Sequence, residues 1–517
     1  MDCPELWTDI YFASVAWATE MLKRSRDTDL ILNFRNAKHR TLYEREKEKI
    51  EPLRDALFQM HRIQDIDLNL VTTAELEILF AELEVEAPKL RSLSIKRTSY
   101  MPSKGYPSSF TKPQYIFSPK FLCGGAPRLQ RLEIVGCCLP WQEGIPNLFS
   151  SQLTNLLLID GDEAKQRPTL TQLLDILTTL PMLQRLELQY TLPSTQNNAR
   201  SLPHSGRVIS LLQLQHFGLK GACLDCVGLL NALSFPLTTT IKIECDPLRE
   251  WLEGCSALID SLSKCHGSTL RPQKLFLSHL NNRSTSFCVK MWDNFDPTIE
   301  TETAHFPCSI QVDMSADPEF TGSHPIENIL PVFIDPLDLD SLQVLEVVRA
   351  CWTESLWCRY FGELPQLSHI RLWNAGAEHL VGVMAPSQAI GTRIQVRSKM
   401  CFHSLKSLTL ENVQFRGRFN DLDVGKFVDA LMLRAEYGAE LHELVISDAI
   451  EILHKDVALF KEVVASVIWD GVVKDDPEYY DYEDYDHEDY HDGEYDGGEY
   501  DDDEDYGDYE NYDSIYD

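Results

Sequence analysis

Two cysteines spaced as C-x-x-C, Cys223 and Cys226, are the residues best suited to chemistry in this chain of 517 residues. A structural zinc site would need a second such pair, and Cys245, Cys255 and Cys265 lie ten residues apart, which is not a ligand spacing. A redox pair would need a thioredoxin-like strand and helix, whereas this motif begins an apolar segment. We therefore predict that these thiols are buried in a hydrophobic core.

The other residue types used in catalysis show no catalytic spacing. The 15 His are scattered without H-E-x-x-H, and neither the phosphate-binding G-x-x-x-x-G-K-[ST] nor the nucleophile motif G-x-S-x-G occurs. Ser, His and Asp are abundant, but nothing in the sequence brings them together. We predict a protein that is not an enzyme and that has no cofactor and no metal site.

A repeated short pattern is the strongest signal in the sequence. The segment LQRLEIVGCCL places Leu129, Leu132, Ile134, Cys137 and Leu139 in the frame L-x-x-L-x-L-x-x-C-x-L, which is the frame of a leucine-rich repeat. Each copy is a strand with a return segment, and it cannot bury its apolar face without its neighbours. A stack of such copies usually forms an extended surface that binds another protein.

Ten copies of the frame lie between about residue 61 and residue 450. They are Ile63-Ile66-Leu68, Leu90-Leu93-Ile95, Leu129-Leu132-Ile134, Leu153-Leu156-Leu158, Leu183-Leu186-Leu188, Leu214-Phe217-Leu219, Leu342-Leu345-Val347, Leu367-Ile370-Leu372, Leu405-Leu408-Leu410 and Leu441-Leu444-Ile446. Adjacent copies are 24 to 39 residues apart, which is wider than the roughly 20–29 of a regular repeat. We therefore predict an α/β fold, an irregular leucine-rich-repeat solenoid that forms a horseshoe with a parallel inner sheet.

Helical segments are expected between the copies. Residues 169–181 fit a helix with Thr169 as its N-cap, and residues 223–236, 247–265 and 424–438 fit three more. Between about residues 220 and 340 the frame nearly vanishes, which predicts an extended or distorted part of the same solenoid. Within it, 287–292 and 309–314 alternate like strands, and 296–307 fits a loop.

The alternation inside each copy predicts which residues contact a partner. Successive side chains of a strand point to opposite faces, so the residues between the frame positions line the concave surface. The candidate partner-binding residues are Arg131, Glu133, Arg185, Glu187, His216, His369, Arg371, Ser407 and Thr409.

Charge and pattern divide the chain into three predicted parts. Residues 1–60 read as a helical segment with a short strand at 30–34, residues 61–470 as the solenoid, and residues 471–517 as a disordered tail. From 475 to 517 there are 22 Asp or Glu, 11 Tyr and no Lys or Arg, which leaves −11 of the total charge of −33 for the rest. Such a tail either keeps the protein soluble or binds basic surfaces such as histones.

Composition also limits the partners and the compartment. The chain has no basic field for nucleic acid, no apolar run that could span a membrane and no signal peptide at its N-terminus. The 14 Cys do not form a dense, secreted-type framework. We expect a cytoplasmic or nuclear protein with free thiols, whose partner is a protein of unknown identity.

Four phrases resemble one protein family. PELWTDI (4–10), WATEMLKRS (17–25), APRLQRLEI (126–134) and RPTLTQLLDIL (167–177) are similar to phrases of the F-box proteins of mushroom-forming fungi. In that family an F-box precedes the first phrase, and degenerate leucine-rich repeats follow. This chain begins at the first phrase, and residues 1–60 hold no match to the family's adaptor-binding helix.

The resemblance implies a function in ubiquitin transfer. The F-box would bind the Skp1 adaptor of a cullin-RING ligase while the repeats hold the substrate, so we expect Skp1 as a partner only if an F-box is encoded upstream. The alternative is suggested by the acidic tail behind a repeat domain. That arrangement resembles the acidic leucine-rich nuclear phosphoproteins, which are chaperones of histones.

Overall fold

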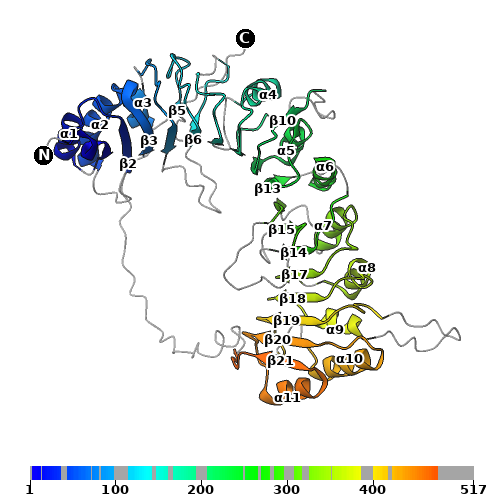
Figure 1. The fold of residues 1–517 in the computed structure, drawn as a ribbon. Coiled ribbons are helices and arrows are strands. Elements are labelled where there is room, and N and C mark those ends of the chain that lie inside the picture. The colour runs from blue at the N-terminus through cyan, green and yellow to red at the C-terminus, as the bar shows by residue number, and fades with distance from the viewer. Residues whose placement is uncertain are drawn as a thin grey trace, which may run out of the picture. The chain divides into compact units, whose positions relative to one another are not determined.

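The computed structural model describes residues 3–12, 14–35, 43–70, 73–80, 83–97, 115–142, 147–160, 167–193, 206–248, 251–265, 269–279, 285–295, 308–316, 325–350, 352–385, 400–416 and 422–474. These residues form a mixed α/β structure in which 17 strands build one large, mostly parallel sheet that does not close on itself (Figure 1). The chain divides into two units, Met1–Lys474 and Asp475–Asp517. The predicted acidic tail and the predicted loop at 296–307 lie outside the described residues.

The large sheet contains its strands almost in chain order. Side by side they are β1 (Asp9–Tyr11), β2 (Leu30–Arg35), β3 (Ile63–Leu70), β4 (Ser92–Arg97), β6 (Arg131–Val135), β8 (Asn155–Ile159), β9 (Arg185–Gln189), β11 (His216–Gly221), β13 (Thr240–Leu248), β16 (Ile310–Ala316), β15 (Thr285–Trp292), β14 (Lys274–His279), β17 (Val344–Val348), β18 (His369–Trp373), β19 (Ser407–Glu411), β20 (Glu443–Ser447) and β21 (Ser466–Trp469). Two short parallel pairs stand apart from it, β5 (Tyr115–Ile116) with β7 (Cys137–Cys138) and β10 (Ile209–Ser210) with β12 (Leu233–Ser234).

The helices lie along one side of this sheet (Figure 1). They are α1 (Val15–Arg24), α2 (Tyr43–Leu57), α3 (Thr73–Phe80), α4 (Leu170–Thr178), α5 (Cys223–Leu230), α6 (Trp251–Cys265), α7 (Pro325–Ile334), α8 (Glu354–Tyr360), α9 (Glu378–Met384), α10 (Val424–Glu436) and α11 (His454–Val463), with 3-10 turns η1 (Pro4–Trp7) and η3 (Met60–Arg62). The hydrophobic core lies between the helices and the sheet.

Aliphatic residues in register hold the strands together. Leu93, Leu132, Leu156 and Leu186 are successive partners across β4, β6, β8 and β9, and each is at most 1% exposed. Burying one such side chain contributes about 1.5–3 kcal/mol, so the aligned column stabilises each strand only beside its neighbours. Each of the ten predicted frames falls on a strand of this sheet, which confirms the α/β class and the parallel sheet.

A turn and a backbone ladder recur before the strands. Leu129 N donates to Ala126 O at 3.0 Å, so the first Leu of the frame closes a turn before β6. Gln130 N then donates to Arg91 O at 2.8 Å, and Thr154 N donates to Gln130 O at 2.8 Å. This ladder satisfies the backbone groups that precede the strands, which buried chain requires.

A left-handed residue follows many of the strands and directs the chain away from the sheet. A non-glycine residue adopts this conformation rarely, and Asn and Asp tolerate it best. The residues at these positions, with φ between 49° and 72°, are Gly136, Tyr190, Arg349, Asn374, Asn412 and Asp448. The same conformation at the same place in successive units indicates one repeated backbone geometry.

The predicted helices are confirmed as α4, α5, α6 and α10, except that the helix predicted over 223–236 ends at Leu230 and Leu233–Ser234 form the strand β12. Thr169 is the N-cap of α4, as predicted: its hydroxyl accepts from Gln172 N at 3.2 Å, and Gln172 Oε1 accepts from Thr169 N at 2.9 Å. The strand expected at 30–34 is β2.

The two ends of the repeat region differ from the predicted boundaries. Residues 1–60 contain α1 and α2 as expected, but β1 and β2 pair in parallel with each other and β2 pairs with β3, so this segment continues the large sheet. At the other end Lys474 N donates to Ala449 O at 3.0 Å, and the unit ends after Lys474 rather than after residue 470.

Three strands interrupt the chain order where the frame fades. After β13 the chain passes through α6 to β14, which lies beyond β16 and β15 in the sheet. The strands β15 and β16 then fill the gap, and β15 runs antiparallel to both of its neighbours. The two strand-like runs predicted in this region are therefore strands, and their meander is the distortion of the repeat.

Candidate functional site

We call the side of the sheet away from the helices the open face. Every second side chain of each strand points to it. On β6, Leu132 and Ile134 are buried in the core, so Arg131 and Glu133 point to the open face. All nine predicted partner-binding residues occupy such positions: Arg131 and Glu133 on β6, Arg185 and Glu187 on β9, His216 on β11, His369 and Arg371 on β18, and Ser407 and Thr409 on β19.

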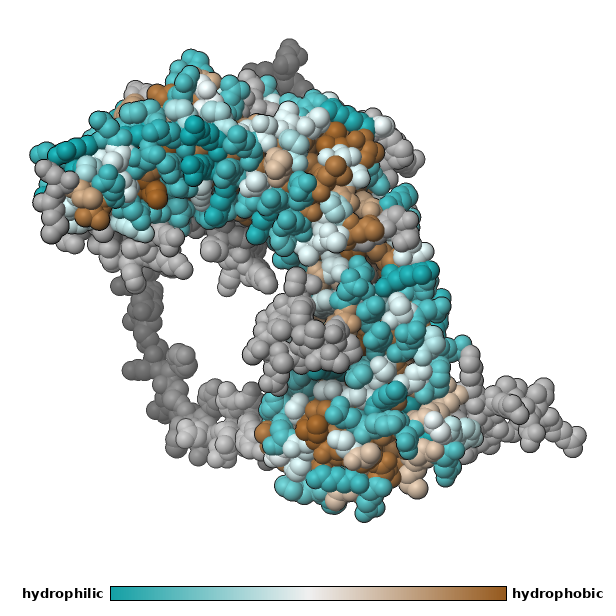
Figure 2. Space-filling model, in the orientation of Figure 1, coloured by the Kyte–Doolittle hydropathy of each residue, from teal (hydrophilic) through white to brown (hydrophobic). Residues whose placement is uncertain are grey.

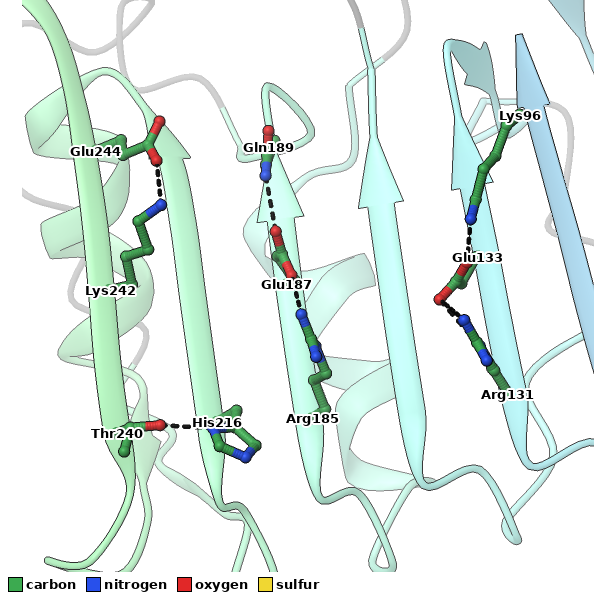
Figure 3. Close-up of polar contacts among 10 residues, drawn as sticks. All are labelled: Lys96, Arg131, Glu133, Arg185, Glu187, Gln189, His216, Thr240, Lys242 and Glu244. Atoms are coloured by element: carbon green, nitrogen blue, oxygen red, sulfur yellow. Dashed lines mark hydrogen bonds and ion pairs between the residues drawn. The ribbon is translucent and has the colours of Figure 1, made fainter. Parts of the chain in front are cut away.

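Glu133 binds two cations from two neighbouring strands (Figure 3). Lys96 Nζ on β4 lies 2.9 Å from Glu133 Oε2, and Arg131 Nη2 lies 2.5 Å from Glu133 Oε1. Burial alone would raise the pKa of Glu133, but hydrogen bonds from the two cations and their charges outweigh burial and lower the pKa. The carboxylate is therefore ionised at neutral pH and orients both cations.

Glu187 on β9 is held in a similar way (Figure 3). Arg185 Nη2 lies 3.1 Å from Glu187 Oε2, and Gln189 Nε2 donates to Glu187 Oε1 at 2.8 Å. Gly218 on β11 is the register partner of Glu187, and a Cβ at that glycine would come within 3.0 Å of Glu187 Cγ. The glycine therefore leaves room for the Glu187 side chain to lie along the sheet.

Glu244 on β13 repeats the arrangement of one carboxylate with two cations. Lys220 Nζ on β11 lies 2.9 Å from Glu244 Oε2, and Lys242 Nζ lies 2.6 Å from Glu244 Oε1. Burial again opposes ionisation, and the hydrogen bonds from Lys242 and Lys220 outweigh it, so the pKa of Glu244 is lowered. The charges of Asp313, the register partner of Glu244 on β16, and of Glu187 also act on Lys242, so the cations here are neutralised by carboxylates of neighbouring strands.

Most cations of these clusters are more exposed than the carboxylates, Lys220 with 27% against 29% for Glu244 being the exception. The side chain of Arg131 is 51% exposed while that of Glu133 is 13% exposed, and the values for Arg185 and Glu187 are 55% and 24%. Lys242 is likewise more exposed than its carboxylate partner. At these three pairs the open face therefore presents Arg131, Arg185 and Lys242 to a partner, with the neutralising carboxylates lying closer to the sheet.

A further carboxylate cluster joins β14, β17 and β18. Lys274 Nζ lies 3.1 Å from Glu346 Oε1, and Arg371 Nη1 lies 3.0 Å from the same oxygen. Lys274 Nζ also lies 5.1 Å from the ring centroid of Trp292 and 4.8 Å from that of Phe295, which are cation–π distances. Lys274 is buried, so its charge is compensated by Glu346 and by the faces of two aromatic rings.

A hollow of about 260 Å³ opens on the same part of the open face. Phe276 on β14, Val348 on β17 and Trp373 on β18 provide its apolar walls. Arg371 and Glu411 line it as well and give it a polar margin. The hollow combines an aromatic wall with an arginine, which are the residue types enriched at the centres of protein interfaces.

Three of the other predicted residues, His216, His369 and Ser407, are less accessible to a partner. His216 Nδ1 and the Thr240 hydroxyl are hydrogen-bonded at 2.6 Å (Figure 3), and His369 is partly buried. Ser407 departs from the expectation of an exposed residue, because its hydroxyl donates to Glu443 Oε2 at 2.9 Å and the residue is only 7% exposed. The carboxylate on the next strand covers it.

The C-x-x-C cysteines are buried, as predicted, with Cys223 and Cys226 both fully inaccessible to solvent. A hydrogen bond with Cys245 and burial raise the pKa of Cys223 well above its ordinary value, so this thiol stays protonated. Among the described residues, no group of three or more His, Cys, Asp or Glu side chains could hold a metal ion.

The sequence interpretation passed over several residues of the open face. Lys96 and Lys242 stand on strands at alternate positions, and Trp373 follows Arg371 by two residues, so the same alternation would have found all three. Phe276 lies between Leu275 and Leu277 in a frame that is only partial. The missed residues are the aromatic walls and the second cations of the clusters.

The molecular surface in Figure 2 is mainly hydrophilic with scattered apolar patches. One brown patch lies over the region in which Figure 1 labels β10 and α5. The exposed apolar residues in that stretch of chain are Val208, Leu212, Leu224 and Leu237.

No protein-family model matches the sequence, and a comparison with curated proteins finds no match. Within the described part of the chain, no helix is both long enough and apolar enough to cross a membrane. The geometry of the open face is therefore the main basis for assigning a function.

Proposed function

We propose that the chain is a leucine-rich-repeat scaffold, without enzymatic activity, that binds a protein partner on its open face. The repeat assignment is supported by the ten frames, by the turn and backbone ladder before the strands and by the left-handed residue after them. A repeat protein of this kind offers a long surface of strands built from equivalent positions. Free thiols at all cysteines among the described residues fit a cytoplasmic or nuclear location.

The arrangement of charge on the open face supports binding most directly. Glu133, Glu187, Glu244 and Glu346 each fix one or two cations in a defined geometry. Side chains fixed before binding lose less conformational entropy when a partner arrives. The hollow at Trp373 would add an apolar contact to this charged surface.

The partner is proposed to be a substrate of a ubiquitin ligase, in line with the resemblance to fungal F-box proteins. In this arrangement the repeats hold the substrate, and an F-box encoded upstream would bind Skp1. The test measures binding of purified Skp1 to the 517-residue chain and to the chain extended by the upstream-encoded sequence. Binding of Skp1 by the extended chain supports the ligase role. If neither the 517-residue chain nor the extended chain binds Skp1, the ligase role is wrong and only the scaffold role remains.

A histone chaperone is the second candidate, and the acidic composition of residues 475–517 favours it. Basic proteins would then bind these carboxylates by charge. The open face presents cations, so it does not complement a basic partner. Loss of histone binding on deletion of residues 475–517 would support the chaperone role, and histone binding that survives the deletion would exclude the tail from it.

A further inference from the structure

We propose that the hollow between β14, β17, β18 and β19 binds an acidic peptide segment through one aromatic or large apolar anchor residue. This inference rests on the proposed function, because it specifies the kind of protein segment that the open face takes. The hollow lies beside the meander of β14, β15 and β16, where the regular repeat is interrupted.

The size and walls of the hollow fit a single side chain. Its volume of about 260 Å³ lies below the roughly 300–1,000 Å³ of small-molecule sites. Phe276 and Trp373 supply aromatic walls, and Val348 lies at its base as a buried residue. Trp373 remains 40% exposed, so its ring offers apolar area that a partner's side chain can cover. An aromatic anchor gains both area and ring contacts there.

Cations stack on the aromatic residues that wall the hollow. The Arg349 guanidinium carbon lies 5.6 Å from the ring centroid of Trp373, and Lys290 Nζ lies 5.0 Å from that of Phe276. A residue inserted between these rings would bring its chain neighbours close to both cations. Carboxylates at those neighbouring positions would be attracted, and lysines or arginines there would be repelled.

Arg371 supplies the most direct contact for such a carboxylate. Its side chain is 44% exposed and contacts Glu346 through Nη1, so a partner's carboxylate can approach the exposed part of the guanidinium. Glu346 is only 13% exposed and lies against both Arg371 and Lys274, so it does not shield the cation from a partner. Glu346 and Glu411 both line the hollow, so the partner's acidic residue can be accommodated only at its margin, beside Arg371, Arg349 or Lys290.

The charge pattern favours an acidic peptide over nucleic acid. On β6, β9 and β13 the exposed cations alternate with carboxylates nearer the sheet, so no continuous basic stripe forms on these described strands for a phosphate backbone. The sequence before residue 475 also has a net charge of −11 rather than a positive one. A flexible peptide can place separate carboxylates over separate cations, whereas a phosphate chain has a uniform spacing.

The experiment measures fluorescence anisotropy of labelled peptides with the full-length protein. The probe is a short peptide of Asp and Glu with one central Phe, and its matched versions carry a central Ala or replace the acidic residues by Lys. We expect the Phe probe to bind about tenfold more tightly than the Ala version, as for the loss of one hot-spot contact. The Lys version should not bind measurably, and raised salt should weaken the Phe probe.

Two variants and two matched controls locate the site. Trp373→Ala and Arg371→Glu should each weaken the Phe probe at least about tenfold. Tyr437→Ala and Lys426→Glu make the same kinds of change at exposed positions of the α10 region and should leave affinity unchanged. Arg371→Gln, which keeps a long polar side chain without its charge, should show an intermediate loss and guards against a misfolded variant.

Several results would overturn the inference. They are equal binding of the Phe and Ala probes, equal effects of Trp373→Ala and Tyr437→Ala, or tighter binding of a single-stranded RNA than of the peptide. If the Phe probe does not bind while a protein partner still binds elsewhere on the open face, only the inference about the hollow is wrong. If no partner contacts the open face at all, the proposed function is wrong as well.

Discussion

Replacing Glu346 by glutamine should destabilise the sheet locally, because it removes a negative charge in direct contact with the buried Lys274. Lys274 has a side chain that is only 9% exposed and has Glu346 Oε1 at 3.1 Å. The introduced amide could still accept a hydrogen bond, but it would leave the ammonium group charged and poorly solvated. The aromatic rings of Trp292 and Phe295 would remain near the ammonium group.

The size of the effect follows from burial. Breaking a fully buried pair by removing one partner costs about 3–5 kcal/mol, and the remaining hydrogen bond and ring contacts reduce this to about 2–3 kcal/mol. Glu187→Gln is the matched control, since Glu187 occupies the same position on its own strand. Its partner Arg185 is 55% exposed and returns to water, so the control should cost less than about 1 kcal/mol.

Native-state hydrogen exchange is the suitable assay, because it reports the opening of individual strands as well as global unfolding. The reporting amides belong to β14 and β17, for example Val344 N, which donates to Gln273 O at 3.2 Å. Their opening free energy should fall in Glu346→Gln and be partly restored by adding Lys274→Met. Equal losses in Glu346→Gln and Glu187→Gln would refute the account of this cluster.

Two further predictions concern stability. Thr169→Ala should lower the free energy of unfolding by about 1 kcal/mol, because it removes the capping bond to Gln172 N at the start of α4. Thr353, the N-cap of α8, makes no capping bond, so Thr353→Ala should lower this free energy by less than about 0.5 kcal/mol. Thermal unfolding of both variants measures the difference. Burial would raise the pKa of Asp456, but hydrogen bonds from Arg416 at 2.6 and 2.9 Å outweigh burial and lower this pKa. The ion pair therefore stabilises the fold fully above about pH 4, and this contribution is lost as the pH falls further. Arg416 is 37% exposed and Leu453 N still donates to Asp456, so Arg416→Met should cost about 1–2 kcal/mol at pH 7, with a deficit that narrows below about pH 4; a deficit independent of pH would contradict the pairing.

The repeated part of the fold could be predicted because its signal is local. A frame such as Leu129-Leu132-Ile134 lies within one short segment, and it predicts both the position of the turn and the side chains that are buried. The short helices α8 and α9 have seven residues each and too few turns to show a period. The order β13, β16, β15, β14 depends on pairing between segments far apart in the sequence, which alternation within each strand does not specify.

The candidate site could be predicted only as a set of outward positions. Alternation placed Arg131, Arg185 and Arg371 on the open face correctly. Alternation also puts Glu133 and Glu187 on the same face as Arg131 and Arg185, with which they pair within one strand. It did not indicate the pairs of Arg371 with Glu346 and of Lys96 with Glu133, because these meet across strands whose register the sequence does not state. Ser407 is covered for the same reason, because its neighbour across the register is a glutamate.

Site-specific photo-crosslinking in cells tests the central claim, that the open face is the protein-binding surface. A photoreactive amino acid would replace Arg185, Arg371 or Lys426 in the full chain, one position at a time. The account predicts that the same partner proteins are crosslinked from the positions of Arg185 and Arg371 and are absent from the position of Lys426, on α10. Equal or stronger crosslinking from the position of Lys426 would contradict it.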